Sequence, residues 1–122
     1  AKLLKVLLAG GTSESGELVF GAGTVRSLVA DYTSEEPNLS RATRLEQGWG
    51  LGWKLQRLAN GGVYGSAVPA GSFGHWGASG TVAWADPVSG TSFVLLTNGL
   101  YDSETAAIKA CGNIAASALC GV

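Results

Sequence analysis

Three apolar segments separated by short turns constrain the fold of this chain more than any other feature of its sequence. They cover residues 73–76, 81–85 and 92–97. Residues 86–90 (Asp-Pro-Val-Ser-Gly) form a strong turn signal between the second and third segments. Strands joined by turns this short must be antiparallel neighbours in one sheet. The third segment is apolar without interruption, which predicts a strand buried on both faces.

The sequence before these segments predicts two helices, a loop and one more strand. Near the start, four leucines recur at helical spacing: Leu3, Leu4, Leu7 and Leu8. Gly10-Gly11 then end the pattern as a helix C-cap does. Residues 24–30 favour a short second helix, and the polar residues 31–46 predict a surface loop. A strand is expected over residues 49–55, and Asn60-Gly61-Gly62 interrupts it.

The end of the chain predicts a helix that packs on the sheet. Asp102 or Ser103 is a suitable N-cap for it. Small apolar residues then recur along one predicted face: Ala107, Cys111, Ile114, Ala115 and Ala118. The fold class is therefore α+β, with an antiparallel sheet of at least three strands flanked by helices. A helical lead-in covers about residues 1–46, and the sheet with the C-terminal helix covers about residues 47–122.

The composition indicates that the chain buries a face against more protein. Of its 122 residues, 46% are hydrophobic and 14% are charged, whereas soluble domains carry about 25% charged residues. The first helix also begins without an N-cap, which is typical of a fragment or a cleaved chain. The alternative is a self-sufficient domain rich in Gly and Ala that covers its own core.

Charge, histidine and cysteine content argue against several classes of function. The net charge is −1 without any run of Lys or Arg, so no nucleic-acid partner is expected. No segment approaches the roughly 20 apolar residues that span a bilayer, so no membrane partner is expected. A single histidine and the absence of Cys-x-x-Cys argue against a metal, and no cofactor is expected. Cys111 and Cys120 lie in one predicted helix, roughly 13 Å apart and too far for a disulfide.

His75 is the main candidate for chemistry. It lies between Gly74 and Gly77, with Gly80 beyond, and these glycines leave one side of the strand bare. A bare strand lets a substrate backbone or acyl group approach closely, and its amides can form an oxyanion hole. The alternative is a histidine that only forms hydrogen bonds inside the sheet.

The same region carries a resemblance to a known family. Residues 74–81 (Gly-His-Trp-Gly-Ala-Ser-Gly-Thr), then Asp86-Pro87 and residues 95–98 (Leu-Leu-Thr-Asn), resemble the C-terminal region of class C β-lactamase-related serine hydrolases. These penicillin-binding-protein-like enzymes include D-alanyl-D-alanine carboxypeptidases, D-aminopeptidases and esterases. Residues 48–53 resemble the strand before the family's third motif, and the two predicted helices resemble those preceding it. The resemblance implies that residues 1–122 are a single C-terminal portion of a β-lactamase/transpeptidase-like fold, which is therefore incomplete.

The resemblance also implies roles for three residues. The family's third motif is Lys-Thr-Gly or His-x-Gly, and His75-Trp76-Gly77 is the matching triplet. His75 is then expected to face the active site and to bind or polarise the carboxylate or acyl end of the substrate, with Gly77 beside it. The backbone N–H of Ala78 is expected to donate to an oxyanion hole. Trp76 is expected on the opposite side of the strand, in the core.

Two of the family's catalytic motifs do not occur in this sequence. No lysine follows a serine by three positions, and neither Tyr-x-Asn nor Ser-x-Asn is present. In the family both motifs lie upstream of the matched region. The resemblance therefore implies the C-terminal part of a serine hydrolase that acts through an acyl-enzyme on an amide, lactam or ester. Its expected partners are a small acyl substrate and the N-terminal remainder of the protein as a second chain, in a secreted or periplasmic location.

Two other functions remain open at this point. The strands could belong to a non-catalytic binding or interaction module. Four tryptophans could form a carbohydrate-binding surface, although alternating aromatic residues in strands favour a core: Trp49, Trp53, Trp76 and Trp84.

Overall fold

The computed structural model describes residues 1–57 and 62–121, apart from the side chains of residues 101–104. The helices of this part are α1 (Lys2–Leu8), α2 (Ala22–Val29), α3 (Arg41–Glu46) and α4 (Tyr101–Leu119). Its strands are β1 (Gly48–Trp49), β2 (Lys54–Leu55), β3 (Phe73–Gly77), β4 (Thr81–Asp86) and β5 (Thr91–Leu95). The predicted interruption at Asn60-Gly61 lies outside the described residues.

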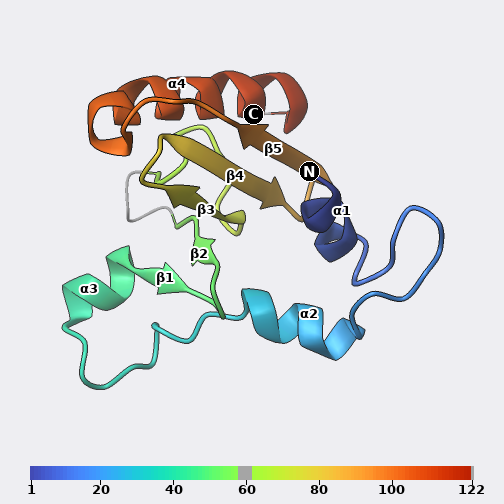
Figure 1. Ribbon diagram of the computed structural model, residues 1–122. Coiled ribbons are helices and arrows are strands. Elements are labelled where there is room, and N and C mark those ends of the chain that lie inside the picture. The colour runs from blue at the N-terminus through green and yellow to red at the C-terminus, as the bar shows by residue number, and fades with distance from the viewer. Residues whose placement is uncertain (58–61, 122) are drawn as a thin grey trace.

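All five strands form one antiparallel sheet in the order β1-β2-β3-β4-β5 (Figure 1). β3 and β4 pair from Phe73↔Ala85 to Gly77↔Thr81, and β4 pairs with β5 from Val82↔Leu95 to Asp86↔Thr91. The short turns between these strands permit only this arrangement. The predicted α+β class and antiparallel sheet are confirmed.

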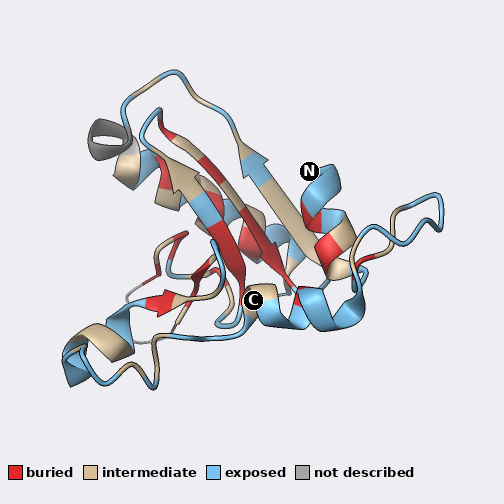
Figure 2. Ribbon diagram, turned by 60° about the horizontal axis from the view of Figure 1, so that its bottom comes forward, coloured by how far each residue is buried: buried red, intermediate tan, exposed pale blue. Residues whose placement is uncertain are grey.

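The sheet separates two buried clusters. On one face, α1 and α2 pack on the strands. The buried residues of this cluster come from both helices and from β2, β3 and β4: Leu4, Leu7, Val25, Leu55, Phe73 and Ala85. On the other face, α4 and the loop before β3 cover the sheet: Tyr64, Val68, Val82, Trp84, Ile108 and Ala116. Figure 1 shows α4 lying along β5 and β4, and Figure 2 shows buried residues along the central strands. Both predicted N-terminal helices are confirmed, and so is packing of the C-terminal helix on the sheet.

The single strand predicted over residues 49–55 is wrong, because this segment is a hairpin. β1 and β2 are antiparallel, and Gly50 N donates to Trp53 O across the turn (2.8 Å). Gly52 has φ +79°, a conformation that favours glycine. Gly50 approaches α2 so closely that a Cβ would lie 2.2 Å from the Leu28 carbonyl oxygen. Gly50 and Gly52 were expected within a single strand, and they form the turn of the hairpin instead.

The predicted loop over residues 31–46 is too long. Its last six residues form α3, and the Ser40 side chain caps this helix by accepting from Thr43 N (3.1 Å). The remaining loop starts with Asp31, whose Oδ1 accepts from the amides of Thr33 and Ser34. A serine cap followed by six helix-compatible residues was the signal for this short helix.

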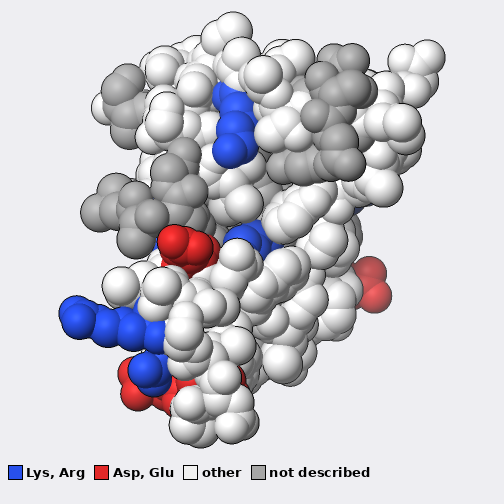
Figure 3. Space-filling view, turned by 90° about the vertical axis from the view of Figure 1, so that its left-hand side faces the viewer, with Lys and Arg blue, Asp and Glu red and all other residues white. Residues whose placement is uncertain are grey.

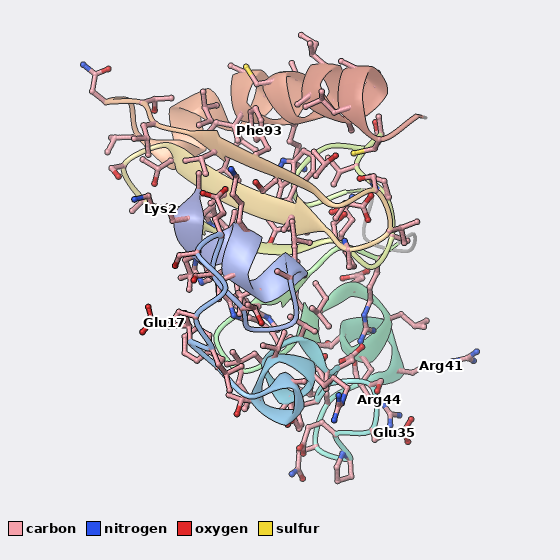
Figure 4. All side chains as sticks on the ribbon, turned by 90° about the vertical axis from the view of Figure 1, so that its right-hand side faces the viewer. Lys2, Glu17, Glu35, Arg41, Arg44 and Phe93 are labelled. Carbon is pink, nitrogen blue, oxygen red and sulfur yellow. The ribbon has the colours of Figure 1, made fainter. Side chains whose placement is uncertain are left out.

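The predicted burial of the last strand on both faces is also wrong. β5 is an edge strand that pairs only with β4 among the described residues. Phe93 and Leu95 pack toward the cluster beneath α4, and Figure 4 shows Phe93 between β5 and that helix. On the other face, Val94 is 38% exposed, and Leu96 just beyond the strand is 77% exposed. One apolar face of this strand therefore has no cover in the described part of the chain.

α4 differs from its prediction in both its start and its buried face. It begins at Tyr101 with Leu100 at the N-cap and no side-chain cap, before the predicted Asp102 or Ser103. Its buried residues recur every fourth position: Ile108, Gly112 and Ala116. Ile114 of the predicted stripe is 70% exposed. Gly112 fixes the contact, because a Cβ there would lie 2.0 Å from the Tyr64 carbonyl oxygen.

Candidate functional site

β3 has an open edge beside His75. β2 pairs with β3 only through Lys54↔Gly74 and Leu55↔Phe73, whereas β4 pairs along the whole of β3. Residues 75–77 therefore have a neighbouring strand on one side only, within the described part of the chain. This agrees with the expectation of an accessible strand.

The His75 ring is exposed and contacts two tryptophan rings at this edge, which also contact each other. Its centroid is 5.2 Å from that of Trp76, with the two rings nearly parallel at 23°. The Trp49 ring approaches it to 5.6 Å at 54°. Trp76 also packs against the cluster beneath α4, as predicted, but its ring is only partly buried and stacks on His75, so the expected separation of the two rings by the strand is wrong. Three rings from β1 and β3 thus form one aromatic group, which is defined here as the aromatic edge: Trp49, His75 and Trp76.

The backbone determines which nitrogen of His75 carries a proton. Nδ1 lies 2.6 Å from the carbonyl oxygen of Trp76. A carbonyl oxygen only accepts hydrogen bonds, so Nδ1 must donate. In the neutral ring Nε2 therefore holds a lone pair and accepts a hydrogen bond, whereas protonation turns Nε2 into a donor. His75 can orient a hydroxyl group in the first form and bind an anionic oxygen in the second.

The two glycines on either side of His75 are required for different structural reasons. Gly74 is buried, and a Cβ there would lie 2.1 Å from the Ala83 carbonyl oxygen. It is therefore required for packing against β4, and the prediction that it leaves the strand bare is wrong. Gly77 is half-buried, and a Cβ there would meet the Thr81 hydroxyl at 2.6 Å. Gly77 thus keeps the end of β3 narrow beside the turn.

Ala78 lies at the second position of the turn between β3 and β4. The turn is closed by Gly80 N donating to Gly77 O (3.0 Å), and Gly80 has φ +71°. The Thr97 hydroxyl donates to the Gly80 carbonyl (2.7 Å) and holds the turn against the chain after β5. Ala78 is exposed, and its amide takes part in none of the hydrogen bonds found among the described residues. An amide without a partner at an exposed residue of a fixed turn is suited to binding an oxyanion.

Lys54 is a buried residue of this region that sequence reasoning missed. It is 2% exposed, and its Nζ donates to Gln47 Oε1. The same Nζ lies 5.0 Å from the centre of the Trp49 ring. Burial lowers the pKa of the Lys54 ammonium group. A lysine inside an apolar, aromatic strand segment is the signal that could have identified it.

The tryptophans divide between core and edge. Trp84 is fully buried, and Trp53 packs edge-on against Phe73 in the cluster beneath α1. Only Trp49 and Trp76 remain near the surface beside His75. A carbohydrate-binding surface made of all four tryptophans is therefore wrong.

The two cavities found in the described part of the chain lie away from His75 and Ala78. One, of about 440 Å³, lies near Arg57, which pairs with Asp31, and near Gln56, whose amide bonds to Gly65 O and Val68 O. The other, of about 410 Å³, lies between α1 and the loop with Glu14, which pairs with Lys5. Apart from the exposed Lys2 beside α1, the charged groups that line them are already paired within the chain. The aromatic edge is the better candidate site.

Charge and metal-binding groups add no competing site. Figure 3 shows a mostly uncharged surface on the side of α3 and the start of α4, with few charges of each sign. Figure 4 shows Glu35 and Arg41 at the periphery of the molecule. Within the described residues no three His, Cys, Asp or Glu side chains are grouped as metal ligands, and both cysteines are free. No helix of that part is long and apolar enough to cross a bilayer.

Comparisons with known proteins bear on the fold and the family of the chain. The chain matches the family model described as Beta-lactamase over residues 8–113. Among solved structures it is similar to a penicillin-binding protein homologue from Caulobacter crescentus, at 26% sequence identity and a TM-score of 0.60. That alignment covers 80% of this chain and 24% of the homologue, so the chain spans about a quarter of that protein. No curated protein matches the chain significantly. The Beta-lactamase match runs from the end of α1 into α4 and crosses every strand, and the chain belongs to the Beta-lactamase family.

Proposed function

We propose that this chain is the C-terminal part of a serine hydrolase that acts through an acyl-enzyme. It supplies one wall of the active site: the open edge of β3 with His75 and Gly77, and the Ala78 amide in the following turn. The observation that carries the proposal is an exposed Ala78, whose amide has no hydrogen bond among the described residues, three positions after an exposed histidine on an open strand edge. The nucleophile comes from the remainder of the protein, because no Ser-x-x-Lys occurs in these 122 residues.

The proposed chemistry is acyl transfer in two steps. A serine oxygen of the remainder attacks the acyl carbon of an amide, lactam or ester, and the serine proton passes to the nitrogen or oxygen of the broken bond. The amine or alcohol then departs, except in a lactam, where the amine stays attached to the opened ring. Negative charge develops on the acyl oxygen, toward which the Ala78 N–H donates. His75 Nε2 accepts from a nearby hydroxyl when the ring is neutral and binds an anionic oxygen when it is protonated. Water then attacks the acyl-serine and releases the acid.

The chain's exposed apolar surface supports a partner of the same protein. Val94 and Leu96 lie uncovered on the α1 side of the sheet edge, and Leu3 on α1 is 52% exposed. Apolar surface at a strand edge promotes association until it is covered. The Caulobacter homologue is much longer than this chain, which supports the remainder of the protein as the partner that covers this apolar surface.

Hydrolysis assays on the chain alone and on the reassembled protein test this proposal. The isolated chain should not turn over nitrocefin or a p-nitrophenyl ester. The chain mixed or joined with the upstream segment should do so, and a Ser→Ala change in that segment's Ser-x-x-Lys should remove the activity. Turnover by the isolated chain that survives further purification would contradict the proposal, as would an inactive but correctly assembled pair.

A non-catalytic binding module is the second candidate, favoured by the aromatic edge. Three rings at an open strand edge can hold a flat or apolar ligand without any nucleophile. Two observations together would support this candidate. The purified protein would be a monodisperse 12.4 kDa species that binds an aromatic or acyl ligand. Intact-mass measurement would find no second, larger polypeptide in the sample.

A further inference from the structure

We propose that Lys54 is a positioning residue for His75 and acts through the Trp49 ring. The inference deepens the proposed function and rests on it for the meaning of His75. It extends the site from β3 to the β1–β2 hairpin. Neither the family match nor the third-motif triplet includes this lysine in the chemistry.

The hairpin places Lys54 beneath Trp49. The two residues are directly paired, Trp49↔Lys54, so their side chains leave the same face of the sheet. Lys54 also pairs with Gly74 on its other side, and Trp84 of β4 packs closely over that glycine. The lysine side chain thus lies on the same face of the sheet as Trp49, and its ammonium group is 5.0 Å from the Trp49 ring centre, within cation–π range.

The ammonium group has few other partners. Its Nζ donates to Gln47 Oε1, and no carboxylate lies within ion-pair distance of it in the described residues. A buried cation without a carboxylate is unfavourable unless other groups compensate it. Gln47 and the face of Trp49 supply that compensation, so the position of the indole and the position of the ammonium group are coupled.

The backbone and the ring of Trp49 are held by different groups. Its amide donates to the Thr33 hydroxyl (3.2 Å), and its carbonyl accepts from Tyr32 N (2.9 Å). These contacts fix the main chain and do not involve the indole. The indole is contacted by the Lys54 ammonium group and by the Trp76 ring, whose centroid is 6.1 Å away, and it lies 5.6 Å from the His75 ring. Gln47 is itself fixed, because its amide donates to Thr43 O at the end of α3 (2.7 Å).

NMR of the aromatic resonances of the whole chain tests this role. Rings at these distances shift each other's proton resonances. Lys54→Met keeps the stem and removes the charge, so the Trp49 indole and His75 ring signals should lose at least half of their ring-current shifts, while the Trp84 indole signal stays in place. Lys54→Arg keeps a cation and a donor, and should restore most of the shift. Lys2→Met, at an exposed lysine of α1, is the matched control and should leave all these signals unchanged.

A second variant keeps the test decisive if Lys54→Met does not fold. Gln47→Leu removes the other anchor of the ammonium group at an exposed residue and should displace the same two signals. Unchanged Trp49 and His75 signals in either folded variant would overturn the proposal. The readout needs no hydrolysis. Displaced signals together with an inactive reassembled protein would contradict the proposed function and leave the positioning role of Lys54 in place.

Discussion

Gly74 on β3 lies directly opposite Trp84 on β4, with no space between them for a side chain. A Cβ at Gly74 would lie 2.7 Å from the Trp84 Cα and 2.1 Å from the Ala83 carbonyl oxygen. Both neighbours are backbone atoms of a central strand and cannot move independently. The strand before His75 is thus fixed against β4 by the absence of a side chain.

Replacing Gly74 with alanine should therefore destabilise the fold. Overpacking of a rigid site costs about 1–3 kcal/mol, and the upper part of that range is expected here. Denaturant unfolding followed by tryptophan fluorescence measures the change. Gly23→Ala is the matched control, because Gly23 is exposed in α2 and a Cβ there meets only one atom, at 3.9 Å. Alanine in a helix should raise stability by roughly 0.5–1 kcal/mol. A neutral Gly74→Ala variant would contradict the packing account.

Lys54→Met should increase stability near neutral pH, by about 1 kcal/mol, because an apolar residue replaces a buried cation. Burial lowers the pKa of Lys54 from its ordinary value of 10.5. Below the lowered pKa the lysine is charged in both the folded and unfolded states, so the full cost of burying the charge is present. Between the lowered pKa and 10.5 the folded state has lost the proton that the unfolded chain still binds, so the wild type gains stability as pH rises.

Urea unfolding of both proteins across this pH range measures the difference. The advantage of Lys54→Met should shrink toward pH 10.5. The Lys2→Met variant removes an exposed lysine and should differ from the wild type by less than about 0.5 kcal/mol at every pH. A constant difference between wild type and Lys54→Met would show that the lysine charge is not the cause.

Ala78→Pro removes the amide donor while the turn is expected to keep its conformation, so its effect on catalysis can be measured apart from its effect on stability. Proline is favoured at the second position of a common β-turn, so stability should change by less than about 1 kcal/mol. It lacks an N–H, however, and loss of one oxyanion donor lowers kcat by about 100- to 1,000-fold. The measurement is kcat for ester hydrolysis by the reassembled protein, with Ser79→Ala as a neighbouring control that keeps its N–H. Full activity in a folded Ala78→Pro variant would remove Ala78 from the oxyanion hole.

Val94→Lys should reduce self-association of the isolated chain. Val94 lies on the open face of the edge strand β5, and a lysine at a sheet edge opposes pairing with another chain. Sedimentation velocity at rising concentration should show a larger monomer fraction, with little change in the unfolding midpoint. Val88→Lys makes the same substitution in the turn between β4 and β5, at a residue 88% exposed, and should not change association. Equal effects of both variants would indicate a general charge effect.

The central sheet could be predicted from the sequence because its determinants are local. Short turns between residues 73 and 97 leave only antiparallel pairing. The role of His75, inferred from its glycine neighbours and the family resemblance, stays a prediction. The buried face of α4 was not predictable from apolarity, since Gly112 sets it by approaching the Tyr64 backbone. That contact joins residues far apart in the sequence, and a helical pattern carries no information about it.

Lys54 was missed for a related physical reason. In a continuous strand, residues five positions apart point to opposite faces, which would separate Trp49 from Lys54. The hairpin turn at Gly50 and Gly52 pairs them and brings both side chains to one face. The prediction of one strand over residues 49–55 therefore placed Trp49 and Lys54 on opposite faces, and the lysine was not recognised as part of the site.

Because β2 begins only at Lys54, the hairpin turn before it can vary among related proteins. β2 stops before it reaches His75, and neither buried cluster includes residues 50–52 of the hairpin turn. Gly50 and Leu51 contact Leu28 of α2, but no residue of this turn contacts α4 in either cluster. Variation in the length of the hairpin would therefore widen or narrow the approach to β3 at the expense of the α2 contact alone, with the packing of α1 and α4 unchanged.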